Sequence, residues 1–147
     1  MTDDVKTFLN YIKTADIRIK NKIVEEYQLR CLATSITAPT DSDPIQTSGV
    51  TDRVGNIVPK IIQVQEEINN MIDHFIDEKQ KRVNLIDLLQ NELEYQVCHM
   101  HYVQYKDLTN IASELGYSYA WILEIHKNAI NNLCQPYLNL YGKSSIM

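Results

Sequence analysis

The side chains best suited to bind a metal ion gather at one place in the chain, the run Cys98-His99-Met100-His101. On a helix Cys98 and His101 would share a face while His99 would not, and no second Cys/His pair stands at zinc-site spacing. No Ser, Cys or carboxylate stands near His126 in an arrangement that activates a nucleophile, and Gly-rich phosphate loops are absent. We therefore expect no enzyme, no metal site and no other cofactor.

Residues 108–133 say most about function, because they form two helical patterns separated by a tight turn. Ile111, Ala112 and Leu115 predict a short first helix, capped by Asp107 and ended by Gly116 in the left-handed conformation. Ser118 can cap a second helix from Tyr119 to about residue 133, and Pro136 is expected to end it. The stripe predicted to be buried on the second helix is Ile122, Ile125, Ala129 and Leu133. Two helices joined this closely must cross steeply, as in a helix-turn-helix.

This part of the sequence resembles the C-terminal helix-turn-helix of sigma-factor region 4. The similarity lies in residues 111–118 (IASELGYS), followed by Ile122, Ile125, His126, Ala129 and Leu133. Nearly the full chain resembles small phage-encoded proteins with a sigma-70 region-4-like C-terminus, related to late-operon transcriptional regulators of the ArpU and RinA type. The matching segments are residues 50–56 (VTDRVGN), 60–62 (KII) and 66–68 (EEI). The resemblance implies transcriptional regulation through promoter DNA, with RNA polymerase as a further partner.

The resemblance also implies which side chains face the partner. They are Ser118 at the start of the second helix and then Tyr119, Ala120, Leu123, Glu124 and Lys127. The chain departs here from its relatives, which usually carry Arg, Glu, Gln or His at several of these positions, because it has no arginine to read guanine. Trp121 at the edge of this face suits either an interface anchor or a lid on the core. The face is thus compatible with DNA or with a protein partner.

Positive charge is scarce around this motif. The net charge of the chain is −5, and residues 95–147 carry three Lys against three Asp or Glu. Because DNA affinity rests largely on the neutralisation of phosphates, any contact must use a few placed cations. The candidate phosphate contacts are Lys106, His126, Arg18, Lys20 and Lys22. For the last three, on the first helix, a solvated face is the alternative interpretation.

Two long amphipathic helices are predicted before the motif. Over residues 3–35 the apolar positions recur with a period near 3.6. They are Val5, Phe8, Leu9, Ile12, Ala15, Ile19, Ile23 and Tyr27. Residues 37–55 are rich in turn formers and are expected to form an exposed loop, after which a second helix should start near Asn56, with Pro59 in its first turn. Its expected coiled-coil seam is Ile57, Ile61, Val64, Ile68, Met71 and Phe75, and a neighbouring apolar row is Ile62, Ile72, Ile76 and Val83.

We therefore expect an all-α fold in three parts. A long N-terminal antiparallel helical hairpin, coiled-coil-like, takes residues 1–90; a small helix-turn-helix domain takes 91–135; and an apolar tail takes 136–147. The domain should begin with a third helix capped by Asn91, with Glu94 at the third helical position. Because one partner helix cannot cover both apolar rows of the second helix, we expect a homodimer.

The function predicted from the sequence is that of a sequence-specific DNA-binding phage transcriptional regulator. The rival interpretation is a protein-binding inhibitor on the same scaffold, which blocks a host or competitor protein, for example a bacterial defence complex, without reading DNA. No apolar run approaches the roughly 20 residues of a membrane span, and Met1-Thr2-Asp3-Asp4 is acidic where a signal peptide would be basic. We expect no membrane partner and a location in the cytoplasm of the bacterial host.

Overall fold

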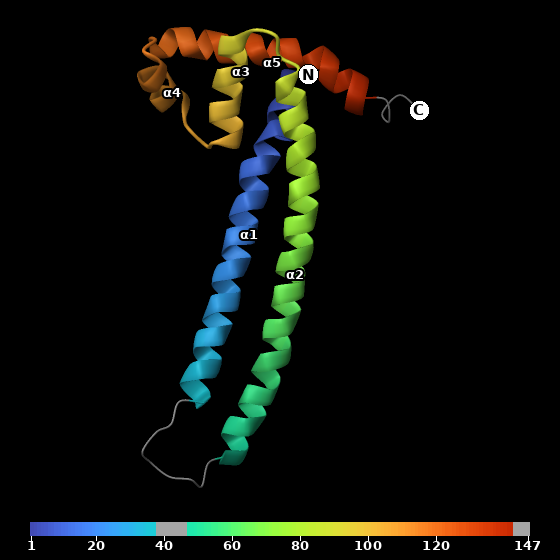
Figure 1. Ribbon diagram of the computed structural model, residues 1–147, viewed down its shortest axis with the longest axis vertical. Coiled ribbons are helices and arrows are strands. Elements are labelled where there is room, and N and C mark those ends of the chain that lie inside the picture. The colour runs from blue at the N-terminus through green and yellow to red at the C-terminus, as the bar shows by residue number, and fades with distance from the viewer. Residues whose placement is uncertain (38–46, 143–147) are drawn as a thin grey trace. The chain divides into compact units, whose positions relative to one another are not determined.

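The computed structural model describes residues 1–37 and 47–142, with side chains placed for 1–35 and 55–142. Every regular element in these ranges is a helix, so the predicted all-α class is confirmed. Figure 1 labels α1 (Thr2–Thr37), α2 (Thr47–Asp87), α3 (Glu92–Cys98), α4 (Leu108–Leu115) and α5 (Tyr119–Tyr141); the π-helical turn η2 (His99–Val103) follows α3. The chain divides into two compact units, Asp16–His74 and Met1–Ala15 with Phe75–Met147. None of the helices in the described ranges combines the length and the apolar character that a membrane span requires.

The start of α2 differs from the prediction. The helix begins at Thr47 and not near Asn56. The expected loop over residues 37–55 is therefore wrong for 47–55 and for Thr37, which ends α1, while 38–46 lie outside the described residues. Pro59 therefore lies inside the helix, where it has no N–H to donate to the carbonyl of Gly55. Because Gly55 is exposed, water can take up that bond. The turn-forming residues that suggested a loop lower helix propensity only slightly, so they do not exclude a helix.

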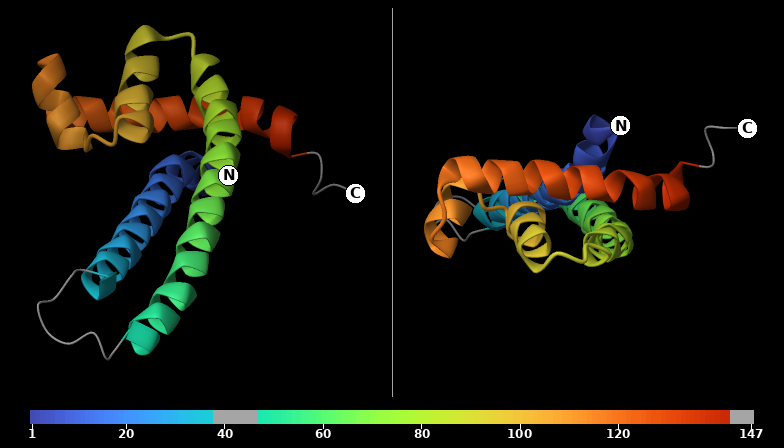
Figure 2. Two further views of the ribbon diagram at one scale, coloured as in Figure 1. Left: turned by 60° about the horizontal axis from the view of Figure 1, so that its bottom comes forward. Right: turned by 90° about the horizontal axis from the view of Figure 1, so that it is seen from above.

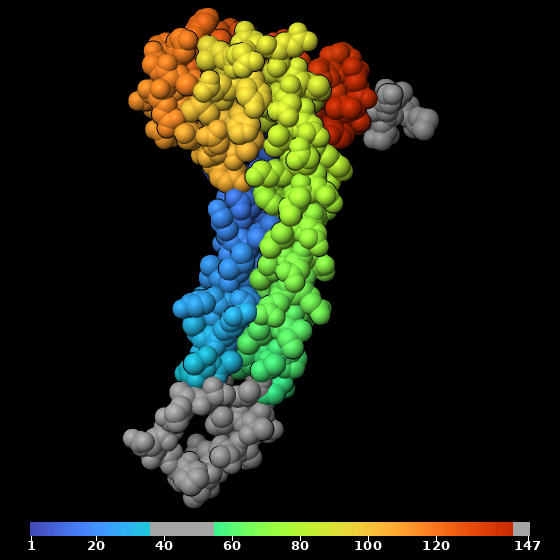
Figure 3. Space-filling model, in the orientation of Figure 1, coloured from blue at the N-terminus to red at the C-terminus, as the bar shows by residue number. Residues whose placement is uncertain are grey.

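In the unit Asp16–His74, segments of α1 and α2 pack side by side in opposite directions. Gln65 donates a hydrogen bond to Glu26 over 3.2 Å, and Lys22 pairs with Glu67 at 3.6 Å, so partner numbers fall along α2 as they rise along α1. The predicted seam of α2 faces inward here, because Ile68 is buried and its neighbours along the seam are half-buried. Figure 3 shows the two segments in contact.

The buried stripe of α1 is not the one predicted over its whole length. Ile23 and Tyr27 were expected to be buried but are 45% and 65% exposed. The side of α1 that turns toward α2 instead repeats every seven residues, through Ile12, Ile19 and the half-buried Glu26. A contact line with a period of 3.5 departs steadily from one with a period of 3.6, so late positions of the 3.6 stripe rotate out to solvent.

The second unit, Met1–Ala15 with Phe75–Met147, holds the larger apolar core. Its buried side chains come from α1, the end of α2, α3, η2 and α5. They are Val5, Leu9, Leu85, Ile86, Cys98, Tyr102, Ala129, Ile130 and Leu133. This core fixes α5 against α3 and against the end of α2, and so determines which side of α5 stays free.

A buried cation joins α1 to α2 within this unit. Arg82 is 8% exposed, and its guanidinium lies 4.1 Å from the ring centres of both Phe8 and Tyr11. It donates a hydrogen bond to the carbonyl of Phe8 over 2.8 Å and pairs with the Glu78 carboxylate at 2.6 Å. Arginine suits this position because its planar group stacks on aromatic rings while its N–H groups remain available to acceptors.

The C-terminal end of α5 also departs from the prediction. Pro136 does not end the helix, which continues to Tyr141 as one element past α3 and the end of α2 (Figure 2). The proline leaves the carbonyl of Asn132 without its helical donor, but Asn132 is exposed to water. The added turns place Tyr137 and Tyr141 against Phe8, with ring centres 5.2 and 4.8 Å apart. This aromatic packing offsets the cost of the internal proline.

Candidate functional site

The candidate site is built on α4, whose two ends are fixed by the residues that the sequence indicated. The Asp107 side chain accepts a hydrogen bond from the backbone N–H of Asn110 over 2.8 Å, and the helix begins at Leu108. At its other end Gly116 has a φ of 76°, and the N–H of Tyr117 donates to the carbonyl of Ala112 over 3.0 Å. A left-handed residue followed by this bond is the usual C-terminal glycine motif.

A tight turn then starts α5. The Ser118 hydroxyl accepts a hydrogen bond from the N–H of Trp121 over 3.1 Å, so the predicted N-cap is confirmed. A second apolar cluster lies under the two helices and holds them together. It comprises Val97, Met100, Ile111, Ala112, Ile122 and Ile125. Because α3, α4 and α5 all contribute to this cluster, the outer side of α5 is held in a defined direction.

All the partner-facing residues implied by the resemblance are exposed. Tyr119, Ala120, Leu123, Glu124 and Lys127 lie opposite the buried stripe of α5, and Ser118 is exposed as well. At 100° per residue, Ala120, Glu124 and Lys127 follow the middle of the outer face, while Tyr119 and Leu123 lie along one edge. The structure therefore brings these residues together on one surface, which we call the α5 outer face.

Two aromatic residues extend this face beyond the predicted set. Trp121 is 47% exposed and lies on the edge of the α5 outer face opposite Leu123, so it is not a lid on the core. Tyr117, in the turn before α5, is 46% exposed. No signal in the sequence indicated this exposure, since an apolar residue after a helix-ending glycine often packs back on that helix.

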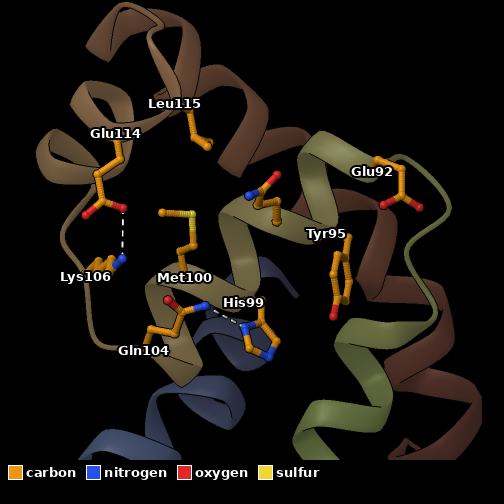
Figure 4. Close-up of a pocket in the computed structure, with 9 residues that line it drawn as sticks. Glu92, Tyr95, His99, Met100, Gln104, Lys106, Glu114 and Leu115 are labelled. Carbon is orange, nitrogen blue, oxygen red and sulfur yellow. Dashed lines mark hydrogen bonds and ion pairs between the residues drawn. The ribbon is translucent and has the colours of Figure 1, made fainter.

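Lys106 is less available for phosphate than its charge suggests. Its ammonium pairs with the Glu114 carboxylate of α4 at 2.8 Å, and its side chain is 34% exposed. The pair links the short connection between η2 and α4, which carries Lys106, to the last turn of α4 (Figure 4). A phosphate would have to compete with a carboxylate that is already in place, so Lys106 contributes little net positive field.

His126 is not a phosphate contact, and this prediction is wrong. Its side chain is 8% exposed, and its Nε2 lies 2.7 Å from the Tyr102 hydroxyl in a buried hydrogen bond. Burial, followed by the charges of His101 and Lys6, lowers the pKa of His126 to about 4. The imidazole is therefore neutral near pH 7. The spacing could have indicated this, because position 126 lies four residues after the buried Ile122.

The remaining candidate phosphate contacts lie on α1 in the unit Asp16–His74. Arg18 is exposed, Lys20 pairs with Asp16 at 3.3 Å, and Lys22 pairs with Glu25 at 3.0 Å as well as with Glu67. The ion pairs of Lys20 and Lys22 agree with the alternative interpretation of a solvated face. They do not belong to the unit that carries the α5 outer face.

The Cys98-to-His101 run shows no arrangement for metal binding. Among the described residues no three His, Cys, Asp or Glu side chains lie close enough to share an ion. His101 Nδ1 is hydrogen-bonded to the carbonyl of Lys106 at 2.7 Å, and His99 Nδ1 to the Gln104 amide at 3.0 Å. Burial raises the pKa of the Cys98 thiol to about 12, so this thiol stays protonated near pH 7.

A cleft of about 450 Å³ lies between α3 and α4, and the sequence did not indicate it. Figure 4 shows Tyr95 and His99 on one side, Met100 between the helices, and the Lys106–Glu114 pair on the other side. The backbone beside it is irregular, because His99–Val103 forms a π-helical turn and Tyr105 has a φ of 64°. The cleft is polar, and its ammonium is already paired, so its geometry does not point to a reaction.

Comparisons of the chain with protein-family models, with characterised proteins and with solved structures find no match. What the α5 outer face does must therefore be inferred from its own geometry and chemistry.

Proposed function

We propose that the protein binds duplex DNA through α5 and regulates transcription, as the phage regulators that it resembles do. The supporting observation is that every residue of the α5 outer face is exposed while the opposite side of the helix is buried. A helix of about 10–12 Å diameter fits the DNA major groove, which is about 12 Å wide. In this proposal α1 and α2 form a coiled-coil-like hairpin that carries the helix-turn-helix.

The chemistry of the face suggests which contacts it makes. The first N–H groups of α5, behind the exposed Ser118, suit a phosphate, and Lys127 supplies a cation two turns along the helix. The Glu124 carboxylate can accept a hydrogen bond from the N4 amino group of cytosine, and Leu123 can contact a thymine methyl group. Binding would therefore be specific but weak, because few phosphates are neutralised.

DNA binding measured at two salt concentrations tests the proposal, with promoter fragments from the protein's own genome as ligands. Lys127→Ala should weaken binding to every sequence and reduce the salt slope by about one unit. Lys13→Ala removes another exposed cation, from α1, and is the matched control. Ala120→Glu should abolish binding without unfolding, because the residue is exposed and the new carboxylate would meet the groove. Absence of binding to all fragments at low salt contradicts the proposal.

A second function, inhibition of a host or competitor protein, is favoured by one specific observation. Tyr117, Tyr119, Trp121 and Leu123 are each about half exposed on or beside the α5 outer face, and no arginine follows Arg82 in the chain. Aromatic side chains are enriched at the energetic centres of protein interfaces, whereas DNA-binding faces are rich in cations. A surface with so few cations would contribute little electrostatic free energy to the binding of DNA, which is a polyanion.

Trp121→Ala and Lys127→Ala together distinguish these two functions. If the face reads DNA, Lys127→Ala weakens binding in proportion to salt, and Trp121→Ala changes it little, because Trp121 lies at the edge. If the face binds a protein, Trp121→Ala should cost about 2 kcal/mol or more in complex formation, and Lys127→Ala little. Binding of DNA by both variants at the wild-type level would contradict the DNA proposal.

A further inference from the structure

The unit Asp16–His74 has too little apolar core for two long helices. Ile19 and Ile68 are the apolar side chains that count as buried among its described residues. The other apolar residues of the α2 seam are only half-buried, and two contacts between the helices are polar, those of Gln65 with Glu26 and of Lys22 with Glu67. Most of the stability of helices in proteins comes from the packing of an apolar face. This pair therefore needs a further surface to pack against.

Exposed apolar side chains of both helices adjoin a groove on one side of the pair, while Ile17, Val24 and Leu32 are exposed to a similar degree elsewhere on α1. A groove between α1 and α2 is lined by Ile23, Glu26, Arg30, Gln65, Ile68 and Asn69. The helical period places Tyr27 next to Ile23 on α1, and Val58 and Ile62 next to Gln65 and Asn69 on α2. Ile23, Tyr27, Val58 and Ile62 are 45%, 65%, 43% and 51% exposed. We call these four residues and the groove between them the groove face.

We propose that the groove face is the interface with a second copy of this chain, packed about a two-fold axis as a four-helix bundle. The charged residues of the groove explain why the occupant is a second copy. Glu26 and Arg30 form an ion pair with each other, so the groove face is neutral although the whole chain carries −5. A two-fold axis between them would set Glu26 of each copy beside Arg30 of the other, so charges of opposite sign meet.

The amides of the groove fit the same occupant. Gln65 and Asn69 each carry both donors and an acceptor, so they can pair with polar groups of either kind on the other copy. The area is also adequate. Each copy can bury on the order of 600 Å² of accessible surface, which comes from the four half-exposed apolar side chains and the groove between them. A standard protein interface buries roughly 800 Å² per partner. The expected result is a dimer with a dissociation constant near the micromolar range.

Sedimentation equilibrium of the full chain at about 5 to 100 μM tests this, since a micromolar dimer dissociates in that range. The wild type should be dimeric at the upper end. Ile62→Glu should raise the dissociation constant by at least about 100-fold, because the symmetric interface would bury two carboxylates. Leu32→Glu is the matched control: it is also 51% exposed, but it lies on the flank of α1 opposite Ile23, and it should leave the dimer intact.

A cross-linking experiment covers the case in which Ile62→Glu unfolds the unit. With the exposed Cys31 changed to Ser, Ile62→Cys should form a disulfide-linked dimer under mild oxidation, whereas Leu32→Cys should not. A wild type that stays monomeric at 100 μM overturns the proposal. A dimer that survives Ile62→Glu, or that is lost with Leu32→Glu, overturns it as well, because the interface would then lie on another surface.

Discussion

The buried hydrogen bond between His126 and Tyr102 predicts that the unit holding α5 loses stability in mild acid. The pKa of His126 falls from its ordinary value of 6.5 to about 4, chiefly through burial. Below pH 6.5 His126 binds a proton in the unfolded chain but stays neutral in the folded chain. The free energy of unfolding therefore decreases as the pH falls from 6.5 toward 4. At pH 4.5 this linkage amounts to about 2.5 kcal/mol relative to pH 8.

Urea unfolding followed by circular dichroism at pH 8 and pH 4.5 measures this loss. Replacement of the imidazole in His126→Leu should lower the free energy of unfolding at pH 8, because the Tyr102 hydroxyl is left without its hydrogen-bond partner. The same variant should show a pH-dependent loss smaller than that of the wild type by about 2.5 kcal/mol. For a unit of this size the wild-type loss corresponds to a melting temperature lower by roughly 10–20 °C.

The exposed His74 provides the control for this experiment. His74→Leu also removes one imidazole, but from the other unit, so it controls for the loss of a histidine as such. If His126→Leu and the wild type lose equal free energy of unfolding between pH 8 and pH 4.5, the titration of His126 does not contribute to the pH dependence, and the reasoning is refuted.

Three further substitutions test how the helices are fixed, with urea unfolding as the measurement. Gly116→Ala should cost about 1 kcal/mol from its left-handed φ of 76° alone, because no atom lies within 4 Å of the added Cβ. Asn91→Ala should cost about 1 kcal/mol, since the cap bonds to the N–H groups of Leu93 and Glu94 are lost; an unchanged midpoint would show that water replaces the cap. Arg82→Ala should cost roughly 3 kcal/mol, because it removes the group between two rings, its hydrogen bond to the Phe8 carbonyl, and one of the two cations that pair with Glu78, the other being Lys81.

The sequence was most informative where structure depends on neighbouring residues. Asn91, Asp107 and Ser118 cap helices as predicted, and Gly116 ends α4, because a cap is a contact between a side chain and a backbone group two or three residues away. The role of Glu94 was not predictable in this way, although a Glu at the third helical position often bonds back to the N–H of the cap residue. Glu94 occupies the third helical position but accepts a hydrogen bond from the Asn132 amide over 2.7 Å, a partner on α5 that local spacing cannot reveal.

The wrong predictions concern residues whose environment is set by distant parts of the chain. The helix after Pro136 exists because Tyr137 and Tyr141 pack on Phe8, from the opposite end of the sequence. Ile23 is exposed because the contact line on α1 follows the coiled-coil period of its partner and not the period of a lone helix. For the candidate site, exposure of the α5 outer face was predictable from spacing, but the pairing of Lys106 with Glu114 was not.

The scarcity of cations links the two proposals, because it sets how strongly DNA binding must depend on a second copy. One α5 offers Lys127 and its N-terminal turn, which is roughly two phosphate contacts, and two α5 helices on one DNA fragment would offer roughly four. With a slope of about −0.9 per phosphate, a rise from 50 to 200 mM salt lowers affinity roughly 12-fold for two contacts and roughly 150-fold for four. Wild-type protein should follow the steeper dependence. Ile62→Glu should follow the shallower one, although it leaves the α5 outer face untouched. Equal salt slopes for the two proteins, measured on the same DNA fragment, would show that each copy binds DNA alone.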